Sequence, residues 1–279
     1  FFTVAHASSD VATGDNTGCV SYDEPQKTIM ISCNDIRLTD IDKQINDPLI
    51  LVDNYNGEKG VWFLNANVVI NKDSTLIIDP QDTKWLKIAA GGDKSLGIQI
   101  LGSLVIDSVK VTSWNPEINN YVKFKLDVKP YPINDTTSKI GKVPRPYIVS
   151  EDATGSTNIT NSELAYLGYD CGGGRCHGLT FYGGNGVVIK DSNIHHNSVG
   201  FYSNGLGHAV LENNHVHHNY GYGFDPHTGT HDMVIRNNTA HDNGGIGLVC
   251  SWDCYNITME DNTVYNNVVA GMMISRNTY

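Results

Sequence analysis

A motif that returns every 22 to 24 residues runs through the second half of the chain and constrains its fold more than any other feature. Each copy begins with an apolar residue followed by polar ones, continues to a second apolar residue and an asparagine, and then reaches a glycine followed by an apolar residue. Short β-rich runs that repeat at this length without a helical stretch predict a solenoid with one coil per repeat. The copies begin at Ile189, Leu211, Ile235 and Met259.

The predicted coils are parallel strands that bury their inward residues and stack roughly 4.8 Å apart. We therefore predict an all-β fold, a parallel β-helix. Asparagines at the same place in successive coils would bond to one another in a ladder, so we interpret them as structural. The asparagines of this column are Asn197, Asn219, Asn243 and Asn267.

The upstream sequence reads as less regular strands of the same stack, with no linker between domains. We predict one β-helix over residues 46–279, with regular coils from about residue 155, and a signal remnant and N-terminal cap over residues 1–45, because an open end exposes unpaired backbone. Residues 168–176 interrupt a coil and should project as a loop. The upstream strands are expected at Val61–Leu64, Val68–Ile70, Leu76–Ile78, Ile98–Leu101 and Leu104–Ile106.

Composition limits the partners and the compartment. The 279 residues carry a formal charge of -11, which argues against nonspecific nucleic-acid binding, and no segment approaches a membrane span. Residues 1–9 resemble the end of a secretory signal, with an ordinary terminus as the alternative. The cysteines are near neighbours, which favours short disulfides in a secreted, extracellular chain over a metal site, because no CxxC occurs. The expected pairs are Cys19 with Cys33, Cys171 with Cys176, and Cys250 with Cys254.

The stretch Tyr222-Gly223-Phe224-Asp225-Pro226-His227 gathers an acid, an imidazole and a phenol on one coil. Strand residues alternate between faces, so Asp225 and His227 share a face, which points outward if Phe224 lies in the core. Pro226 has no N-H for the ladder, and a strand that accepts this loss beside two ionisable residues is typical of a functional site.

This hexapeptide and the repeats that follow it resemble the mannuronan C5-epimerases, which modify alginate and whose right-handed β-helix carries a Tyr-Gly-x-Asp-Pro-His signature. The likeness extends over residues 155–279. It implies an isomerase that inverts C5 of uronate residues in an anionic polysaccharide by removing and returning a proton, with Tyr222, Asp225 and His227 in the active site. The order in which the imidazole and the phenol act stays open, and Asp225 either orients His227 or, if protonated, donates to the substrate carboxylate.

The chain departs from this family where basic residues and a second acid are expected, because Asn197, Ser251 and Val269 stand at those places. Arg276 is the first choice to replace them, since a guanidinium binds a carboxylate through two hydrogen bonds; a solvated surface arginine is the alternative. Arg175, in the inserted loop, is the second choice.

Three further residues of the registered columns are expected to bind substrate. Tyr202, Asn204 and Ser251 stand on coils next to Asp225 and His227. An aromatic residue such as Tyr202 is more often packing than a sugar subsite. The pattern requires no cofactor, and calcium stays open as a ligand.

The histidines form a column of their own, in which His195, His217 and His241 follow one another with His196 and His218 beside them. Stacked imidazoles can bind a transition metal, but an exposed polar ladder is the preferred interpretation, and we assign no metal site. His177 and His208 lie near loop ends from which they could reach the groove.

Two other functions remain open: a polyuronate lyase that acts by β-elimination, and a non-catalytic, polysaccharide-binding matrix β-helix. A glycoside hydrolase is disfavoured, because no second outward carboxylate stands in the Asp225 column. The expected partner is an anionic polysaccharide such as alginate, bound by a monomer.

Overall fold

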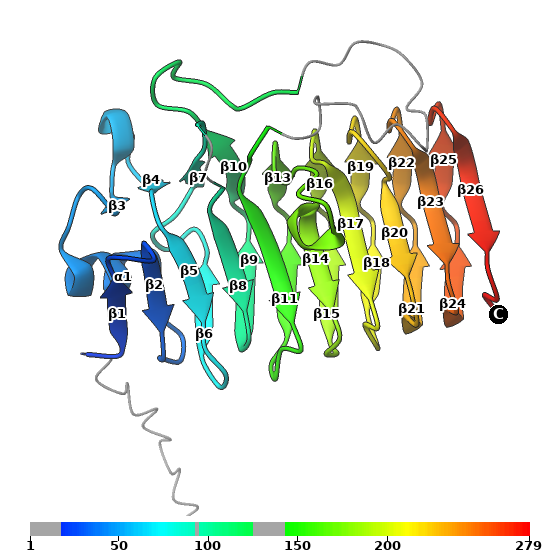
Figure 1. Cartoon of the computed structure of the whole chain (residues 1–279), viewed down its shortest axis with the longest axis horizontal. Helices are drawn as coiled ribbons and strands as arrows, with labels where there is room; N and C mark the ends of the chain where they lie inside the picture. Colours follow the sequence, from blue (N-terminus) through cyan, green and yellow to red (C-terminus); the bar gives the residue numbers. More distant parts are fainter. Residues whose placement is uncertain (1–17, 93–94, 125–142) are drawn as a thin grey trace, which may run out of the picture.

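The computed structural model describes residues 18–92, 95–124 and 143–279, so the expected signal remnant lies outside the described residues. Their strands form three sheets that run along one elongated stack, from β1 at one end to β26 at the other (Figure 1). Successive coils pair in parallel, and β1 with β2 and β3 with β4 pair antiparallel at the N-terminal end. The predicted parallel β-helix is therefore confirmed.

Three strands, one from each sheet, make up a regular coil. The ten-stranded sheet has the order β1 (Val20–Asp23), β2 (Thr28–Ile31), β5 (Asn67–Ile70), β8 (Gly97–Ile100), β11 (Tyr147–Glu151), β14 (Gly178–Tyr182), β17 (Val199–Asn204), β20 (Phe224–His227), β23 (Ile246–Ser251) and β26 (Ala270–Ser275). The nine-stranded sheet has the order β25 (Thr263–Tyr265), β22 (Thr239–His241), β19 (His215–His217), β16 (Asn193–His195), β13 (Glu163–Ala165), β10 (Lys110–Trp114), β7 (Trp85–Ala89), β4 (Val61–Leu64) and β3 (Leu51–Val52). The seven-stranded sheet has the order β24 (Tyr255–Glu260), β21 (His231–Arg236), β18 (Val210–Glu212), β15 (Val187–Lys190), β12 (Thr157–Thr160), β9 (Ser103–Asp107) and β6 (Thr75–Ile78).

The register of the coils matches the sequence repeat. The first apolar residues of the four repeats, Ile189, Leu211, Ile235 and Met259, are consecutive ladder partners. Inward apolar side chains from all three sheets form one continuous core along the stack. Each upstream run expected as a strand overlaps one, at β4, β5, β6, β8 and β9, although β8 ends at Ile100 and leaves out Leu101.

The asparagine ladder forms as predicted. The backbone N-H of Asn197 donates to Oδ1 of Asn219, that of Asn219 to Asn243, and that of Asn243 to Asn267, over 3.0 to 3.1 Å. Each side-chain amide also donates to a main-chain carbonyl, as Asn219 does to Ile194 at 3.3 Å. The ladder thus satisfies backbone groups at turns buried inside the stack.

The glycine step of the repeat has a steric cause. A Cβ at Gly200 would lie 2.4 Å from the carbonyl oxygen of Gly223, and one at Gly223 would lie 2.4 Å from that of Gly247. A side chain at these positions would therefore push adjacent coils apart.

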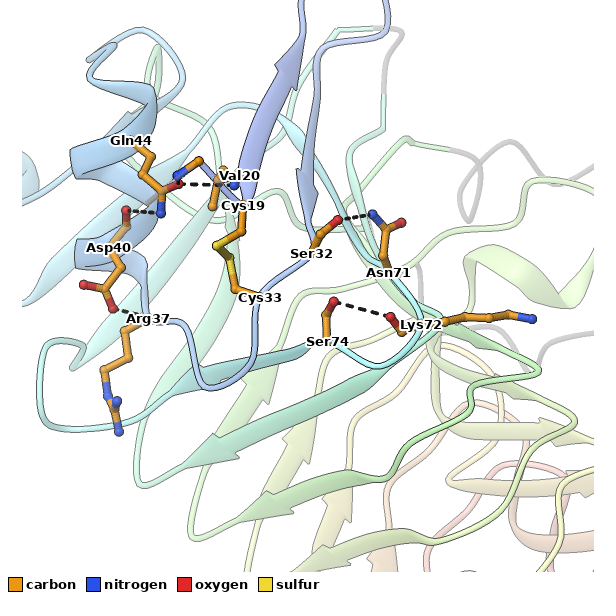
Figure 2. The surroundings of a disulfide bond; sticks show 11 residues. Cys19, Val20, Ser32, Cys33, Arg37, Asp40, Gln44, Asn71, Lys72 and Ser74 are labelled. Carbon is orange, nitrogen blue, oxygen red and sulfur yellow. Dashed lines mark hydrogen bonds between the residues drawn. A yellow bond between two sulfur atoms is a disulfide. The ribbon is translucent and has the colours of Figure 1, made fainter. Parts of the chain in front are cut away.

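The N-terminal end of the stack carries helix α1 (Leu38–Ile45), whose Leu38 and Ile41 are buried in the common core. Strand β2 already pairs in parallel with β5, so the stack begins before residue 46. Figure 2 shows the disulfide between Cys19 and Cys33 beside this helix. The assignment of residues 1–45 to a signal remnant and an N-terminal cap stays a prediction. The described residues also include two short 3-10 helices, η1 (Tyr55–Gly57) and η3 (Gly174–Cys176).

Two of the three expected disulfides form, Cys19 with Cys33 and Cys171 with Cys176. The third was predicted wrongly, because Cys250 and Cys254 are free and buried. The two thiols still contact each other through a side-chain hydrogen bond. The Cys254 thiol also donates to the carbonyl oxygen of Ser251 at 3.2 Å and approaches that of Pro226 at 3.5 Å. Along the described residues, no helix has the length and apolar character of a membrane span.

Candidate active site

The stretch from Tyr222 to His227 lies at strand β20 of the ten-stranded sheet. Tyr202 of β17 is the ladder partner of Asp225, Asn204 is the partner of His227, and His227 is in turn the partner of Ser251 on β23. Phe224 is in the core, which places Asp225 and His227 on the outer face of the sheet. The predicted columns are therefore confirmed, and they gather five of the candidate residues on three adjacent strands.

Pro226 interrupts the ladder, as its missing N-H predicts. Between β20 and β23 the register keeps the partners Phe224 with Leu248 and His227 with Ser251, and skips the two residues between them. The carbonyl oxygen of Pro226 is approached instead by the Cys254 thiol. The irregularity thus lies between the acid and the imidazole of the candidate site.

Asp225 is not the solvent-exposed acid that strand alternation predicted, because its side chain is only 4% exposed. Its Oδ1 has no hydrogen-bond partner among the described residues. Burial raises the pKa of the Asp225 carboxyl well above its usual range, and Cys254 adds to the increase. Burial therefore favours the protonated, neutral form of the Asp225 carboxyl.

The inserted loop changes this face of the sheet, because it folds back instead of projecting into solvent. The Thr180 hydroxyl on β14 donates to the carbonyl oxygen of Gly174 at 2.9 Å. A Cβ at Gly174 would lie 2.6 Å from the ring of Tyr202, the ladder neighbour of Asp225. The loop thus packs against Thr180 and Tyr202 on this face of the sheet, a contact that strand periodicity alone does not predict.

His227 is suited to act as a base. Its Nδ1 lies 2.6 Å from the Thr228 hydroxyl, so when Nδ1 donates that hydrogen bond, Nε2 keeps a free lone pair. Burial lowers the pKa of His227, and the nearby Arg276 lowers it further. The ring is therefore neutral at pH 7.

Tyr222 lies on the other side of Asp225 in the sequence and lines a cavity of about 230 Å³. Burial raises the pKa of its phenol, Asp225 raises it further, and Arg276 partly offsets both effects. The phenol is therefore protonated at neutral pH and can donate. The other residues of the cavity are Asp170, His177, Ser198, Val199, Tyr220, Gly221, Gly245 and Val269.

Arg276 lies at the end of β26, close enough to both Tyr222 and His227 to shift their pKa values. Its guanidinium carbon is 4.1 Å from the centre of the Trp252 ring. Within residues 18–92, 95–124 and 143–279, no carboxylate forms an ion pair with Arg276. Its donors are therefore available to an anionic ligand.

The other residues predicted to bind substrate contact neighbouring side chains of the protein. Arg175 forms an ion pair with Glu151, which neutralises it at the edge of the face. Tyr202 is buried, and its ring centre lies 5.8 Å from that of His227. Burial raises the pKa of Tyr202, and a side-chain hydrogen bond with Asn204 partly offsets this increase. Ser251 is buried and is the ladder partner of His227.

Two residues at the site have no assigned role in the sequence-based interpretation. His177, noted there only as within reach, lies edge-on to Tyr202 with ring centres 5.1 Å apart, and its buried Nδ1 has no partner in the described part of the chain. Trp252 is exposed in the turn after Ser251, with its ring centre 6.3 Å from that of His227. The sequence could have pointed to Trp252, because it directly follows Ser251, the residue that is in register with His227 on the next coil.

Calcium does not fit these residues. Ca²⁺ takes six to eight oxygen ligands, whereas the carboxyl here is buried with a raised pKa and its neighbours are an imidazole, a phenol and a guanidinium. We therefore assign no cation to this site.

Comparisons with known proteins agree with this architecture. A family profile described as "Right handed beta helix region" matches residues 147–279. The crystal structure of the periplasmic alginate epimerase AlgG superposes with a TM-score of 0.75 at 20% sequence identity, covering 90% of this chain. The chain is a right-handed parallel β-helix. It spans 57% of the AlgG chain, and a double mutant of AlgG matches this β-helix with the same identity and coverage and a TM-score of 0.76.

A further solved structure matches less well. The A-module of the mannuronan C-5 epimerase AlgE6 from Azotobacter vinelandii has a TM-score of 0.44 at 18% identity, with 79% of the present β-helix and 59% of that chain covered. The comparison with curated protein sequences finds no match. At these identities the comparisons show the fold alone, so the activity has to be argued from the site.

Proposed function

We propose that this β-helix inverts C5 of uronate residues within an anionic polysaccharide, converting mannuronate to guluronate in an alginate-like polymer. The observation that carries the proposal is the buried acid Asp225, whose Oδ1 has no hydrogen-bond partner among the described residues, on the same short stretch as the phenol of Tyr222 and the imidazole of His227. Burial raises the pKa of the Asp225 carboxyl and lowers that of the His227 imidazole. Arg276, which forms no ion pair with a carboxylate of the described residues, adds a positive charge that acts on both Tyr222 and His227.

The substrate carboxylate is the group that the site must neutralise first, because a carboxylate next to C5 opposes the loss of the C5 proton. Protonated Asp225 donates a hydrogen bond to it without charge repulsion, and Arg276 contributes two further donors. Removing one preorganised donor from such a site lowers kcat by roughly 10²–10³-fold, so these two groups supply much of the stabilisation of the enolate-like intermediate.

Proton transfer uses the two remaining groups. Nε2 of His227 takes the C5 proton, the electrons of the C-H bond pass to the carboxylate, and the intermediate forms. Tyr222 then donates its phenolic proton to C5 from the opposite face. The sugar keeps its composition and inverts C5, and the proton returns from the imidazolium to the phenolate through solvent.

The setting of the site supports this proposal. AlgG, an alginate epimerase, has the same right-handed β-helix fold. The exposed ring of Trp252 offers an apolar face to a sugar next to His227. The two disulfides suit an oxidising compartment, and we propose that the protein is exported.

The test is incubation of the purified protein with polymannuronate in deuterated water, followed by proton NMR and ultraviolet absorbance. Epimerisation gives guluronate that carries deuterium at C5. An unsaturated, ultraviolet-absorbing product would instead establish a lyase, and the absence of both products, with polymer binding retained, would establish a non-catalytic binding protein.

A pair of variants locates the chemistry. His227→Gln should abolish deuterium incorporation, whereas His208→Gln, an exposed histidine on the turn between β17 and β18, should retain it. Equal loss in both variants would contradict the assignment of His227 as the base.

A further inference from the structure

A row of histidines lies on the nine-stranded sheet, outside the proposed active site. At the end of strands β16, β19 and β22, each coil turns through a residue with a left-handed backbone, His196, His218 and Asp242, with φ of 56°, 53° and 51°. The shared conformation aims the three side chains in similar directions. The turns therefore present one polar column along the corner of the stack.

The residues that precede these turns form a second column. The ring centres of His195 and His217 are 5.0 Å apart and nearly parallel, and those of His217 and His241 are 5.2 Å apart. The side chain of each turn residue contacts the imidazole of the histidine that precedes it in the sequence. His217 Nδ1 lies 2.8 Å from His218 Nδ1, whereas on the next coil His241 Nδ1 lies 2.6 Å from a carboxylate oxygen of Asp242.

We propose that His218, His241 and Asp242 form a binding site for a divalent transition metal ion of the zinc class. One ring nitrogen from each histidine and one carboxylate oxygen lie within 4.8 Å of one another. Ligands about 2.0–2.1 Å from Zn²⁺ lie roughly 3–3.5 Å apart in a tetrahedron, so the three donors close around an ion with side-chain movements of about 1 Å.

The donor set selects the class of metal. Two imidazoles and one carboxylate suit Zn²⁺, Cu²⁺ or Ni²⁺, whereas Ca²⁺ requires more oxygen ligands. Three protein ligands leave one position of a tetrahedral Zn²⁺ site open to water. The sequence favours an exposed polar ladder without a metal, but Asp242 adds a carboxylate beside the imidazoles and makes a mixed donor set.

Outer contacts hold both rings in place, as they do at metal sites in proteins. His217, which contacts the His218 ring, also lies 3.0 Å from the Asn193 side-chain oxygen through its Nε2. His215 Nε2 lies 2.6 Å from His241 Nε2. The rings are therefore oriented by neighbours on their own and adjacent coils.

The chain offers a matched control cluster on another face. His208, His231 and Asp232 have the same residue types and the same spacing in sequence as His218, His241 and Asp242. His208 and Asp232 also have left-handed backbones, with φ of 50° and 52°. Asparagine tolerates this conformation, so substitutions to asparagine in both clusters disturb the backbone equally.

The experiment is isothermal titration calorimetry of the full, tag-free, metal-free chain with ZnCl2, NiCl2 and CaCl2. We expect one site for Zn²⁺ and Ni²⁺, no heat with Ca²⁺, and at least tenfold weaker binding in His218→Asn and in Asp242→Asn. His208→Asn and Asp232→Asn should bind as the parent does. Thermal unfolding without metal checks that each variant is folded.

Several outcomes would overturn the proposal. These are no Zn²⁺ binding by the parent, unchanged binding in folded His218→Asn and Asp242→Asn, or equal weakening in the control cluster. If His218→Asn fails to fold, Asp242→Asn decides alone, because it removes the carboxylate charge and keeps the shape of the side chain. The readout is independent of epimerase activity, so failure of one proposal leaves the other intact.

Discussion

The guanidinium of Arg276 lies on the ring face of Trp252, with its central carbon 4.1 Å from the ring centre. The Trp252 ring is in turn 6.3 Å, centre to centre, from the ring of His227. An aromatic face thus holds a positive charge beside His227, the proposed base, and does not neutralise it as a carboxylate partner would. This relationship makes Arg276 the best candidate for binding a substrate carboxylate.

Replacing Arg276 should lower activity by an amount typical of charged hydrogen bonds. Their loss costs about 1.5–3 kcal/mol, so kcat/KM for polymannuronate in Arg276→Ala should fall about 10- to 150-fold. The kcat/KM of Arg276→Lys should lie between those of the parent and of Arg276→Ala, because lysine keeps the charge and loses the paired hydrogen-bond geometry. Initial rates by NMR measure the effect, and Arg236→Ala, which breaks an ion pair with Glu212 on the seven-stranded sheet, is the control. Parent-like rates in Arg276→Ala would exclude this role.

Asp225→Asn should stabilise the protein at neutral pH. The pKa of Asp225 is raised in the folded state, so the folded protein holds a proton that the unfolded chain loses above its ordinary pKa of 3.8. The contribution of Asp225 to the free energy of unfolding is therefore largest below this pH and falls by about 1.4 kcal/mol per pH unit as pH rises from it toward the folded pKa. Urea unfolding at several pH values should show a smaller decline in Asp225→Asn. An identical pH dependence in both proteins would show that Asp225 does not hold the proton.

The same substitution tests the catalytic protonation state. An asparagine amide donates a hydrogen bond as a protonated acid does, so Asp225→Asn should keep more activity than Asp225→Ala, which removes the donor. The alkaline decline of kcat should also move to higher pH in Asp225→Asn, since the group that ionises is gone. If both variants are equally inactive, an ionised Asp225 that orients His227 is the better explanation.

His177 should control stability on the acid side. Burial lowers its pKa from 6.5 to about 4, with Asp170 and His227 acting in opposite directions. The unfolded chain therefore binds a proton that the folded protein does not, and the contribution to the free energy of unfolding is complete above pH 6.5 and lost as pH falls toward about 4. The loss is at most about 3 kcal/mol, and less if solvent reaches the ring.

His177→Phe provides the comparison for that prediction. It keeps the aromatic contact with Tyr202 and cannot titrate. Chemical unfolding at pH 7.5 and pH 4.5 should show a smaller acid loss in the variant than in the parent. A loss as large as in the parent would assign the acid sensitivity to other histidines.

The asparagine ladder should contribute strongly to stability. Asn219→Ala removes the acceptor of the Asn197 N-H and both bonds of its own amide, to Ile194 and to Asn243. Leaving such buried groups unpaired costs about 1–3 kcal/mol each, and a total near 3 kcal/mol is expected. Denaturant unfolding measures it against Asn158→Ala, a strand asparagine whose side chain bonds only to the Ser156 hydroxyl among the described residues. Equal stability of the two variants would contradict the proposed role.

Local chemistry in the sequence was sufficient to predict the coils. Asn219 predicts its ladder because one amide carries both donors and an acceptor, and Gly223 marks where coils approach too closely for a side chain. The register of Asp225 with Tyr202 and of His227 with Ser251 follows from counting along the repeat. The sequence by itself therefore determined the β-helix and the face on which its reactive residues lie.

Tertiary structure decided the environment of those residues. Alternation predicts an exposed Asp225, but burial depends on what covers a strand from elsewhere in the chain, and here a loop inserted two coils earlier builds up the surface around Tyr202. Cys250 and Cys254 are close in sequence and contact each other through their side chains, yet both thiols are free. A repeat specifies position along the stack through local spacing, whereas burial, charge state and bond partners depend on contacts between distant segments.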